Sequence, residues 1–144
     1  QHPHVLSYCS WEVETKGNPL AHAILRGYVD NTGRTCPNYH YEDLMGLYEQ
    51  YQAKNLQNMA VIVDTNHANS GKNHLQQPRI VNEVMHACRH SGEIRSMVKG
   101  FMVESYLEDG NQKVGEGIYG KSITDPCLGW EKTEKMIFEL ADQL

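Results

Sequence analysis

In the stretch MAVIVDTNHANSGKN (residues 59–73), an apolar run leads directly into a cluster of polar side chains. The letters AVIV (60–63) are typical of a buried strand, whereas Asp64, His67 and Lys72 carry groups that bind metals or anions. In parallel α/β proteins such groups gather where the strands leave the sheet. The stretch therefore predicts a strand that ends at a functional site.

Two further apolar runs, HAILRG (22–27) and KGFMVES (99–105), predict strands beside the run at 59–67. Helical patterns fill the gaps at 41–54 and 78–90, and a third follows from residue 130 to 144. The residues expected on one face of each helix are Leu44, Leu47, Tyr48 and Tyr51, then Ile80, Val84, Ala87 and Cys88, then Ile137, Leu140, Ala141 and Leu144.

The order strand, helix, strand, helix, strand, helix predicts an α/β fold with right-handed crossovers and a parallel sheet. A complete eight-stranded barrel needs roughly 200 residues or more, so the pattern fits either part of a barrel or a small open sheet. The segment HVLSYCSWEVETKGNP (4–19) has two short alternating stretches and predicts a β-hairpin ahead of these units.

The composition predicts one soluble domain. The chain has 144 residues and a formal net charge of -5, without a block of basic residues that would face nucleic acid or lipid. No run approaches the roughly 18 apolar residues of a membrane span. The four cysteines are scattered, which favours free thiols and a cytoplasmic protein. The first residue is Gln1 rather than Met, so we consider that a further segment precedes it.

Polar groups follow each predicted strand. Arg26 ends the first strand, His67 follows the second, Glu104 ends the third, and Asp125 lies in the loop beyond. An imidazole and two carboxylates from neighbouring strand ends could share one divalent cation, with mixed nitrogen and oxygen ligands that suit Mn, Fe, Co or Zn. Arg26 could clamp a phosphate or a carboxylate.

Each of these residues also has an ordinary structural interpretation. His67 could cap the following helix, Glu104 could be a solvated strand-end carboxylate, and Asp125 could form an Asx turn before Pro126. Arg26 could make a surface salt bridge.

Four motifs in order resemble the class I 3-deoxy-D-arabino-heptulosonate 7-phosphate (DAHP) synthases, the first enzymes of the shikimate pathway to the aromatic amino acids. They are GNPLAHAILRG, VIVDTNHANSGKN, GFMVESYLEDGNQ and YGKSITDPCLGWE. The resemblance covers the C-terminal portion of that family's chain. It implies a single partial domain over residues 1–144, with a hairpin at 1–20 and about the last three βα units of a (β/α)8 TIM barrel at 21–144.

The resemblance also implies a reaction and its residues. The family condenses phosphoenolpyruvate with erythrose 4-phosphate and releases phosphate, and a divalent metal polarises the aldehyde. By motif, His67, Glu104 and Asp125 match three metal ligands, and Asp125 also touches the sugar. His67 and Asp125 are thus the expected catalytic residues. Arg26 matches an arginine that holds the phosphate of phosphoenolpyruvate.

Two departures from the family pattern qualify this expectation. The fourth metal ligand is a cysteine upstream of the segment that matches, and none of the four cysteines lies in a corresponding motif. The hairpin resembles the element that helps bind an inhibiting aromatic amino acid, with Ser7 and Val13 at matching positions, but it is shorter between them. The family also predicts a homo-oligomer.

Two alternatives remain open from the sequence. The related octulosonate-phosphate synthases use an arabinose phosphate acceptor, although the letters HANSGKN and DPCLGW argue against them. A non-catalytic half-barrel that binds a metal or assembles with a partner is the alternative from another class, because open strand edges and apolar surface promote association.

Overall fold

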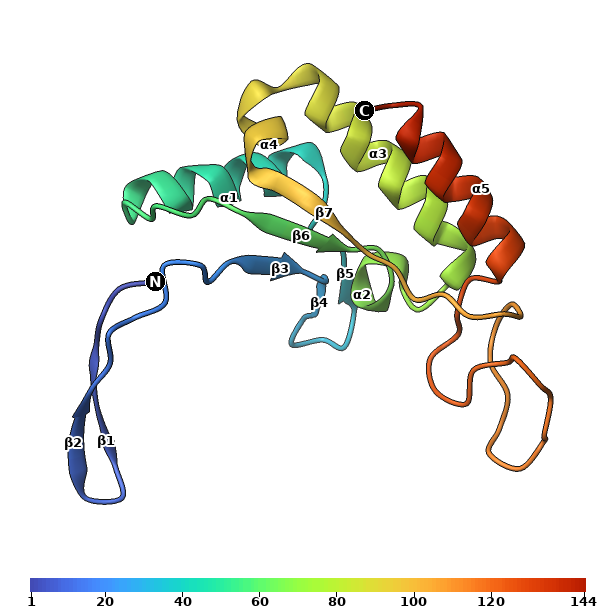
Figure 1. Cartoon of the computed structure of the whole chain (residues 1–144), viewed down its shortest axis with the longest axis horizontal. Coiled ribbons are helices and arrows are strands. Elements are labelled where there is room, and N and C mark those ends of the chain that lie inside the picture. Colours follow the sequence, from blue (N-terminus) through green and yellow to red (C-terminus); the bar gives the residue numbers. More distant parts are fainter.

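A three-stranded parallel sheet forms the centre of the molecule in the computed structural model, which describes residues 1–144 (Figure 1). Its strands are β3 (Ala23–Leu25), β6 (Val61–Asp64) and β7 (Val98–Met102), in the order β3-β6-β7. Both strand pairs are parallel, which confirms the predicted α/β class. The strands β3, β6 and β7 are shorter than the runs predicted from the sequence.

The helices cover one face of this sheet (Figure 1). They are α1 (Tyr41–Ala53), α3 (Gln77–His90), α4 (Gly92–Met97) and α5 (Trp130–Ala141). The main core lies between sheet and helices, and its fully buried side chains include Leu44, Val61, Val63, Ile80, Val84, Ile94 and Met97. The predicted faces of α1 and α3 are confirmed, since their members are buried or pack against this core.

Local hydrogen bonds explain where several helices begin. The Asp43 carboxylate accepts the backbone N–H of His40 ahead of α1, and the Ser91 hydroxyl accepts the N–H of Ile94 at the start of α4. Pro78 lies in the first turn of α3, where its missing N–H costs nothing. No helix of the molecule combines the length and the apolar character that a membrane crossing requires.

The predicted face of the last helix is only partly confirmed, because Leu140 packs against a second core but Ile137, Ala141 and Leu144 are exposed. Thr133 and Met136 are the buried residues of α5, whereas Ile137 is 49% exposed and Leu144 is 86% exposed. The reason is the second, smaller core, in which Met136 packs against α3. Periodicity alone does not identify the side of a helix that meets its neighbour.

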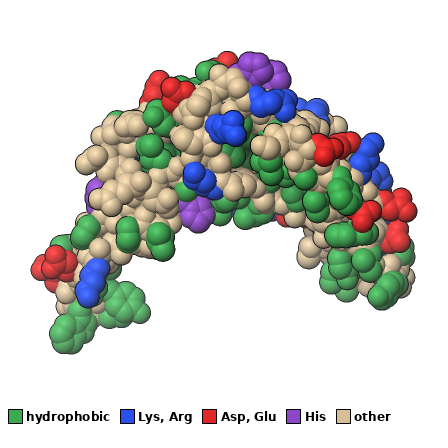
Figure 2. All heavy atoms as spheres, turned by 45° about the horizontal axis from the view of Figure 1, so that its top comes forward, with side chains coloured by type: hydrophobic (Ala, Val, Ile, Leu, Met, Phe, Trp, Pro, Cys, Tyr) green, Lys and Arg blue, Asp and Glu red, His purple; other side chains and the backbone are tan.

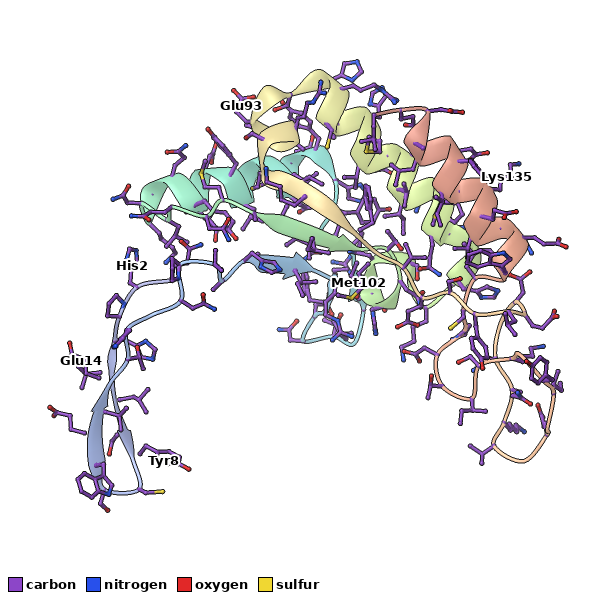
Figure 3. The ribbon with its side chains drawn as sticks, in the orientation of Figure 1. His2, Tyr8, Glu14, Glu93, Met102 and Lys135 are labelled. Atoms are coloured by element: carbon purple, nitrogen blue, oxygen red, sulfur yellow. The ribbon has the colours of Figure 1, made fainter.

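The opposite face of the sheet is not covered. Ile24, Ile62 and Gly100 pair across the three strands, and Met102 lies on the same open side, where it is 40% exposed (Figure 3). The whole chain exposes 9471 Å², whereas a compact monomer of its mass exposes about 7,500 Å². The molecule is therefore an open arch rather than a closed globule (Figure 2).

Two hairpins extend from the body. The predicted one is formed by β1 (Val5–Tyr8) and β2 (Trp11–Glu14), which are antiparallel and project away from the sheet, with Tyr8 near the tip (Figures 1 and 3). Cys9 and Ser10 both have positive φ, as a two-residue hairpin turn requires. The second, β4 (Tyr28–Val29) with β5 (Thr35–Cys36), follows the first sheet strand and was not predicted.

Candidate metal centre

The turn after β6 is built around the carboxylate of Asp64, which is only 2% exposed. One oxygen accepts the backbone N–H of Asn66 at 2.9 Å, and the other lies 2.7 Å from Nδ1 of His67. His67 itself has φ +42, an uncommon conformation for a residue with a side chain. The short helix α2 (His67–Ser70) begins here. The turn therefore fixes both the backbone and the ring of His67.

The other ring nitrogen of His67 faces two carboxylates. Nε2 lies 3.2 Å from Glu104 Oε1 and 3.8 Å from Asp125 Oδ2. One donor atom from each of these three residues lies within 4.8 Å of the other two. His67 and Glu104, predicted at strand ends, and Asp125, predicted in the loop beyond, thus converge on one point.

Buried amides hold Glu104 in place. The side chain of Gln77 accepts the N–H of Glu104 at 2.9 Å and donates to its carbonyl at 2.8 Å. Asn66, which is fully buried, donates to Glu104 Oε2 at 2.8 Å. Oε1 is left to face His67. Buried amides with satisfied hydrogen bonds restrict the carboxylate to this orientation.

A long loop between β7 and α5 brings Asp125 to the site. After β7, residues 105–128 form no helix, and isolated bridges such as Ser105 with Leu128 and Gly110 with Cys127 close the loop. The ammonium group of Lys72 donates a hydrogen bond to the Asp125 carboxylate at 2.9 Å. This hydrogen bond is the main reason why the pKa of Asp125 lies below its ordinary value.

A cleft of about 470 Å³ opens beside these side chains. Its lining includes Arg26, Gly27, Tyr28, Thr35, His67, Lys72 and Asp125. Gly27 has φ +72, and a Cβ there would lie 2.8 Å from the backbone of Ala68, so only glycine permits this approach of β3 to α2. Arg26 is exposed and makes no ion pair within the chain, so it is free to bind an anion in the cleft.

The donor set fits a divalent cation. Ligand atoms about 2.1 Å from a common ion lie roughly 3 to 4 Å apart, and His67 Nε2 is 3.2 Å and 3.8 Å from the two carboxylate oxygens. Because Nδ1 faces Asp64, the Nε2 lone pair is available for a metal. Three carboxylates surround the single imidazole, and a cation would offset their mutual repulsion.

The structure thus brings Arg26, His67, Glu104 and Asp125 to one cleft or its edge. It does not bring Ser7 and Val13 there. Both lie on the projecting hairpin, where Ser7 pairs with Glu12 and Val13 pairs with Leu6, so their side chains point to opposite faces. Their regulatory role stays a prediction.

Sequence reasoning assigned no role to Asn66 and no specific partner to Asp64 or Lys72. Asp64, Asn66 and Lys72 contact the three convergent side chains directly. A signal existed for Asp64, because it precedes His67 by three residues across a turn. The sequence indicates that Lys72 can bind an anion, but it does not predict the contact with Asp125, which lies 53 residues away. Nothing local predicts the contact between Asn66 and Glu104, since 38 residues separate them.

The chain is similar to known DAHP synthases over most of its length. It is 44% identical over 132 residues to the Trp-sensitive phospho-2-dehydro-3-deoxyheptonate aldolase of Enterobacter agglomerans, and 36% identical over 131 residues to that of Escherichia coli K12. These matches cover 90% and 89% of this chain, but only 35% of each relative. The chain therefore spans about a third of the length of these relatives.

A solved structure agrees with the sequence relatives. The phospho-2-dehydro-3-deoxyheptonate aldolase of Francisella tularensis superimposes with a TM-score of 0.79 and 31% identity, over 99% of this chain and 41% of that one. The model of the DAHP synthetase I family matches residues 2–137. The chain therefore belongs to the DAHP synthetase I family.

Proposed function

We propose that this chain carries a substantial part of the active site of a DAHP synthase, which condenses phosphoenolpyruvate with erythrose 4-phosphate and releases phosphate. The observation that supports this best is the convergence of His67, Glu104 and Asp125 beside a cleft that Arg26 also lines, in a chain of this family.

We infer that residues 1–144 are the C-terminal part of a (β/α)8 barrel, with the hairpin at 1–20 and three βα units at 21–144 in one partial domain. Parallel strands with helices on one face only support this architecture, because the interior of a barrel is the face without helices. The apolar open face and the large exposed surface indicate that further protein covers them.

In this proposal His67, Glu104 and Asp125 hold a divalent ion such as Mn, Fe, Co or Zn. When bound, such an ion would polarise the aldehyde oxygen of erythrose 4-phosphate, so that C3 of phosphoenolpyruvate can attack the carbonyl carbon. Water would then add at C2 of the phosphoenolpyruvate unit, and phosphate would leave by cleavage of the C–O bond. Asp64 and Asn66 would keep His67 and Glu104 oriented throughout. The upstream cysteine ligand that the family implies would come from outside this segment.

Cationic side chains in the cleft suit the phosphorylated substrates. The guanidinium of Arg26 can hold the phosphate of phosphoenolpyruvate through two parallel hydrogen bonds. Lys72 adds a second positive charge beside Asp125. Asp125 would then face both the ion and the sugar, which gives it the proposed catalytic contact with substrate.

Regulation and assembly are further parts of the proposal. The relatives are named Trp-sensitive, and we propose that the hairpin with Ser7 and Val13 takes part in binding an aromatic amino acid. Leu6, Tyr8, Trp11 and Val13 share one exposed face of this hairpin. Such an apolar face on a projecting arm supports a homo-oligomer.

An assay of phosphoenolpyruvate consumption tests the proposal. The chain is supplied with erythrose 4-phosphate and Mn²⁺, alone and mixed with the N-terminal part of a relative such as the Enterobacter agglomerans enzyme. We expect consumption only in the mixture, and a large loss with Arg26→Ala. Turnover of arabinose 5-phosphate instead would favour an octulosonate-phosphate synthase. No turnover by the mixture while the chain still binds Mn²⁺ would favour the non-catalytic half-barrel.

A further inference from the structure

The buried carboxylate of Asp64 accepts two hydrogen bonds within the turn after β6. Oδ1 accepts the backbone N–H of Asn66 at 2.9 Å, and Oδ2 lies 2.7 Å from Nδ1 of His67. Asp64 is 2% exposed, so water does not compete for these positions. Its backbone carbonyl accepts the Asn69 side chain at 2.8 Å, which anchors the residue further.

A carboxylate can only accept hydrogen bonds, so the ring nitrogen that faces it must carry the proton. In the neutral ring, Nδ1 of His67 is therefore the N–H, and Nε2 keeps its lone pair. Free imidazole does not impose this choice, because the proton can occupy either nitrogen. The alternative tautomer would present an N–H to Glu104 and Asp125, and it could not bind a metal through Nε2.

We propose that Asp64 is a positioning residue that holds His67 in the Nδ1–H tautomer and keeps Nε2 available as a ligand. This inference rests on the proposed metal role of His67 for its functional meaning, although the tautomer itself can be measured without a metal. The hydrogen bonds of the Asp64 carboxylate go to His67 and to the backbone of Asn66, and its effect on the imidazole is the direct contact with Nδ1.

The substitution Asp64→Asn tests this inference, because the two side chains have nearly the same size and shape. Asparagine has one acceptor oxygen, and the rigid N–H of Asn66 retains it. The amide NH₂ then faces Nδ1 of His67 and donates to it, so the proton moves to Nε2. We expect ring ¹⁵N NMR of the metal-free chain, at a pH where the imidazole is neutral, to show Nδ1–H in the wild type and Nε2–H in the variant.

Zinc affinity gives the second readout. Loss of a hydrogen-bond partner of a ligating histidine commonly costs about 10- to 100-fold in metal affinity, and we expect a loss of this size for Asp64→Asn. Asp30→Asn is the matched control, because Asp30 also accepts the N–H two residues ahead at 2.9 Å but has no histidine partner. It should leave both the His67 tautomer and zinc affinity unchanged.

The outcomes separate this inference from the proposed function. An Nε2–H tautomer in the wild type would overturn the role of Asp64 even if the variant failed to fold. An unchanged tautomer in folded Asp64→Asn would also overturn it. A wild type that shows Nδ1–H but binds no zinc would instead contradict the proposed metal site, and would support the tautomer assignment alone.

Discussion

The ammonium group of Lys72 lies 2.9 Å from Oδ1 of Asp125, although 53 residues separate the two in the chain. Oδ2 of the same carboxylate lies 3.8 Å from Nε2 of His67. Asp125 thus lies between a fixed positive charge and the position proposed for a metal. Lys72 therefore has two opposing effects: it lowers the pKa of Asp125, and it repels a divalent cation.

Lys72→Met should tighten the binding of Mn²⁺ at neutral pH. Removing one positive charge a few ångströms from the ion relieves a repulsion of about 1 kcal/mol, or roughly fivefold in affinity. Calorimetric titration with Mn²⁺ measures the change. A weaker affinity in the variant would show that Lys72 supports the site rather than competing with the ion.

Gly27→Ala should destabilise the chain by about 2 to 5 kcal/mol, because it combines a left-handed backbone with a steric clash. The new Cβ would lie 2.8 Å from the backbone of Ala68 at the site. Urea denaturation measures the free energy of unfolding.

Gly33→Ala is the matched control, since Gly33 has φ +84 and open space around it. It should cost only about 1 to 2 kcal/mol, from the backbone conformation alone. Equal costs at the two positions would contradict the claim that close approach of β3 to α2 requires Gly27.

The ionised carboxylate of Asp109 should make the free energy of unfolding depend on pH in the acid range. Its contact with Lys132 is the largest cause that lowers the pKa of this carboxyl, and the backbone N–H of Gly129 donates to it at 2.7 Å. Because the folded pKa lies below the unfolded value of about 3.9, the stabilisation is complete above that value. It is lost as the pH falls through the folded pKa.

Asp109→Asn should therefore lower the free energy of unfolding at neutral pH and reduce its dependence on pH in acid. Urea denaturation over a series of pH values provides the comparison. Lys132→Met should reproduce part of the effect, because it removes the largest cause that lowers the pKa of Asp109. The same acid dependence in wild type and Asp109→Asn would exclude this anchor of the 105–128 loop to α5.

The central elements of the fold could be predicted from the sequence because their apolar patterns are long. The runs that became β3, β6 and β7, and the periodic segments that became α1 and α3, each carry several buried residues. Likewise, the polar residues after two neighbouring strands pointed to His67 and Glu104, since parallel strands place their carboxyl ends together, and Asp125 was named from the loop beyond.

The remaining features depend on contacts that no local pattern encodes. The strands β4 and β5 have two residues each, too few for a period to appear. The buried side of α5 is set by its packing through Met136. Asn66 and Gln77 acquire their roles only when the chain brings Glu104 beside them.

Binding of Mn²⁺ to this chain and to its His67→Ala variant is the decisive measurement for the metal centre, with calorimetry and electron paramagnetic resonance as readouts. We expect one Mn²⁺ per chain in the wild type, loss of that binding in His67→Ala, and retention in the control His22→Ala, which alters an exposed histidine outside the cleft. Equal binding by wild type and His67→Ala, or none by the wild type, would contradict a metal centre formed by His67, Glu104 and Asp125.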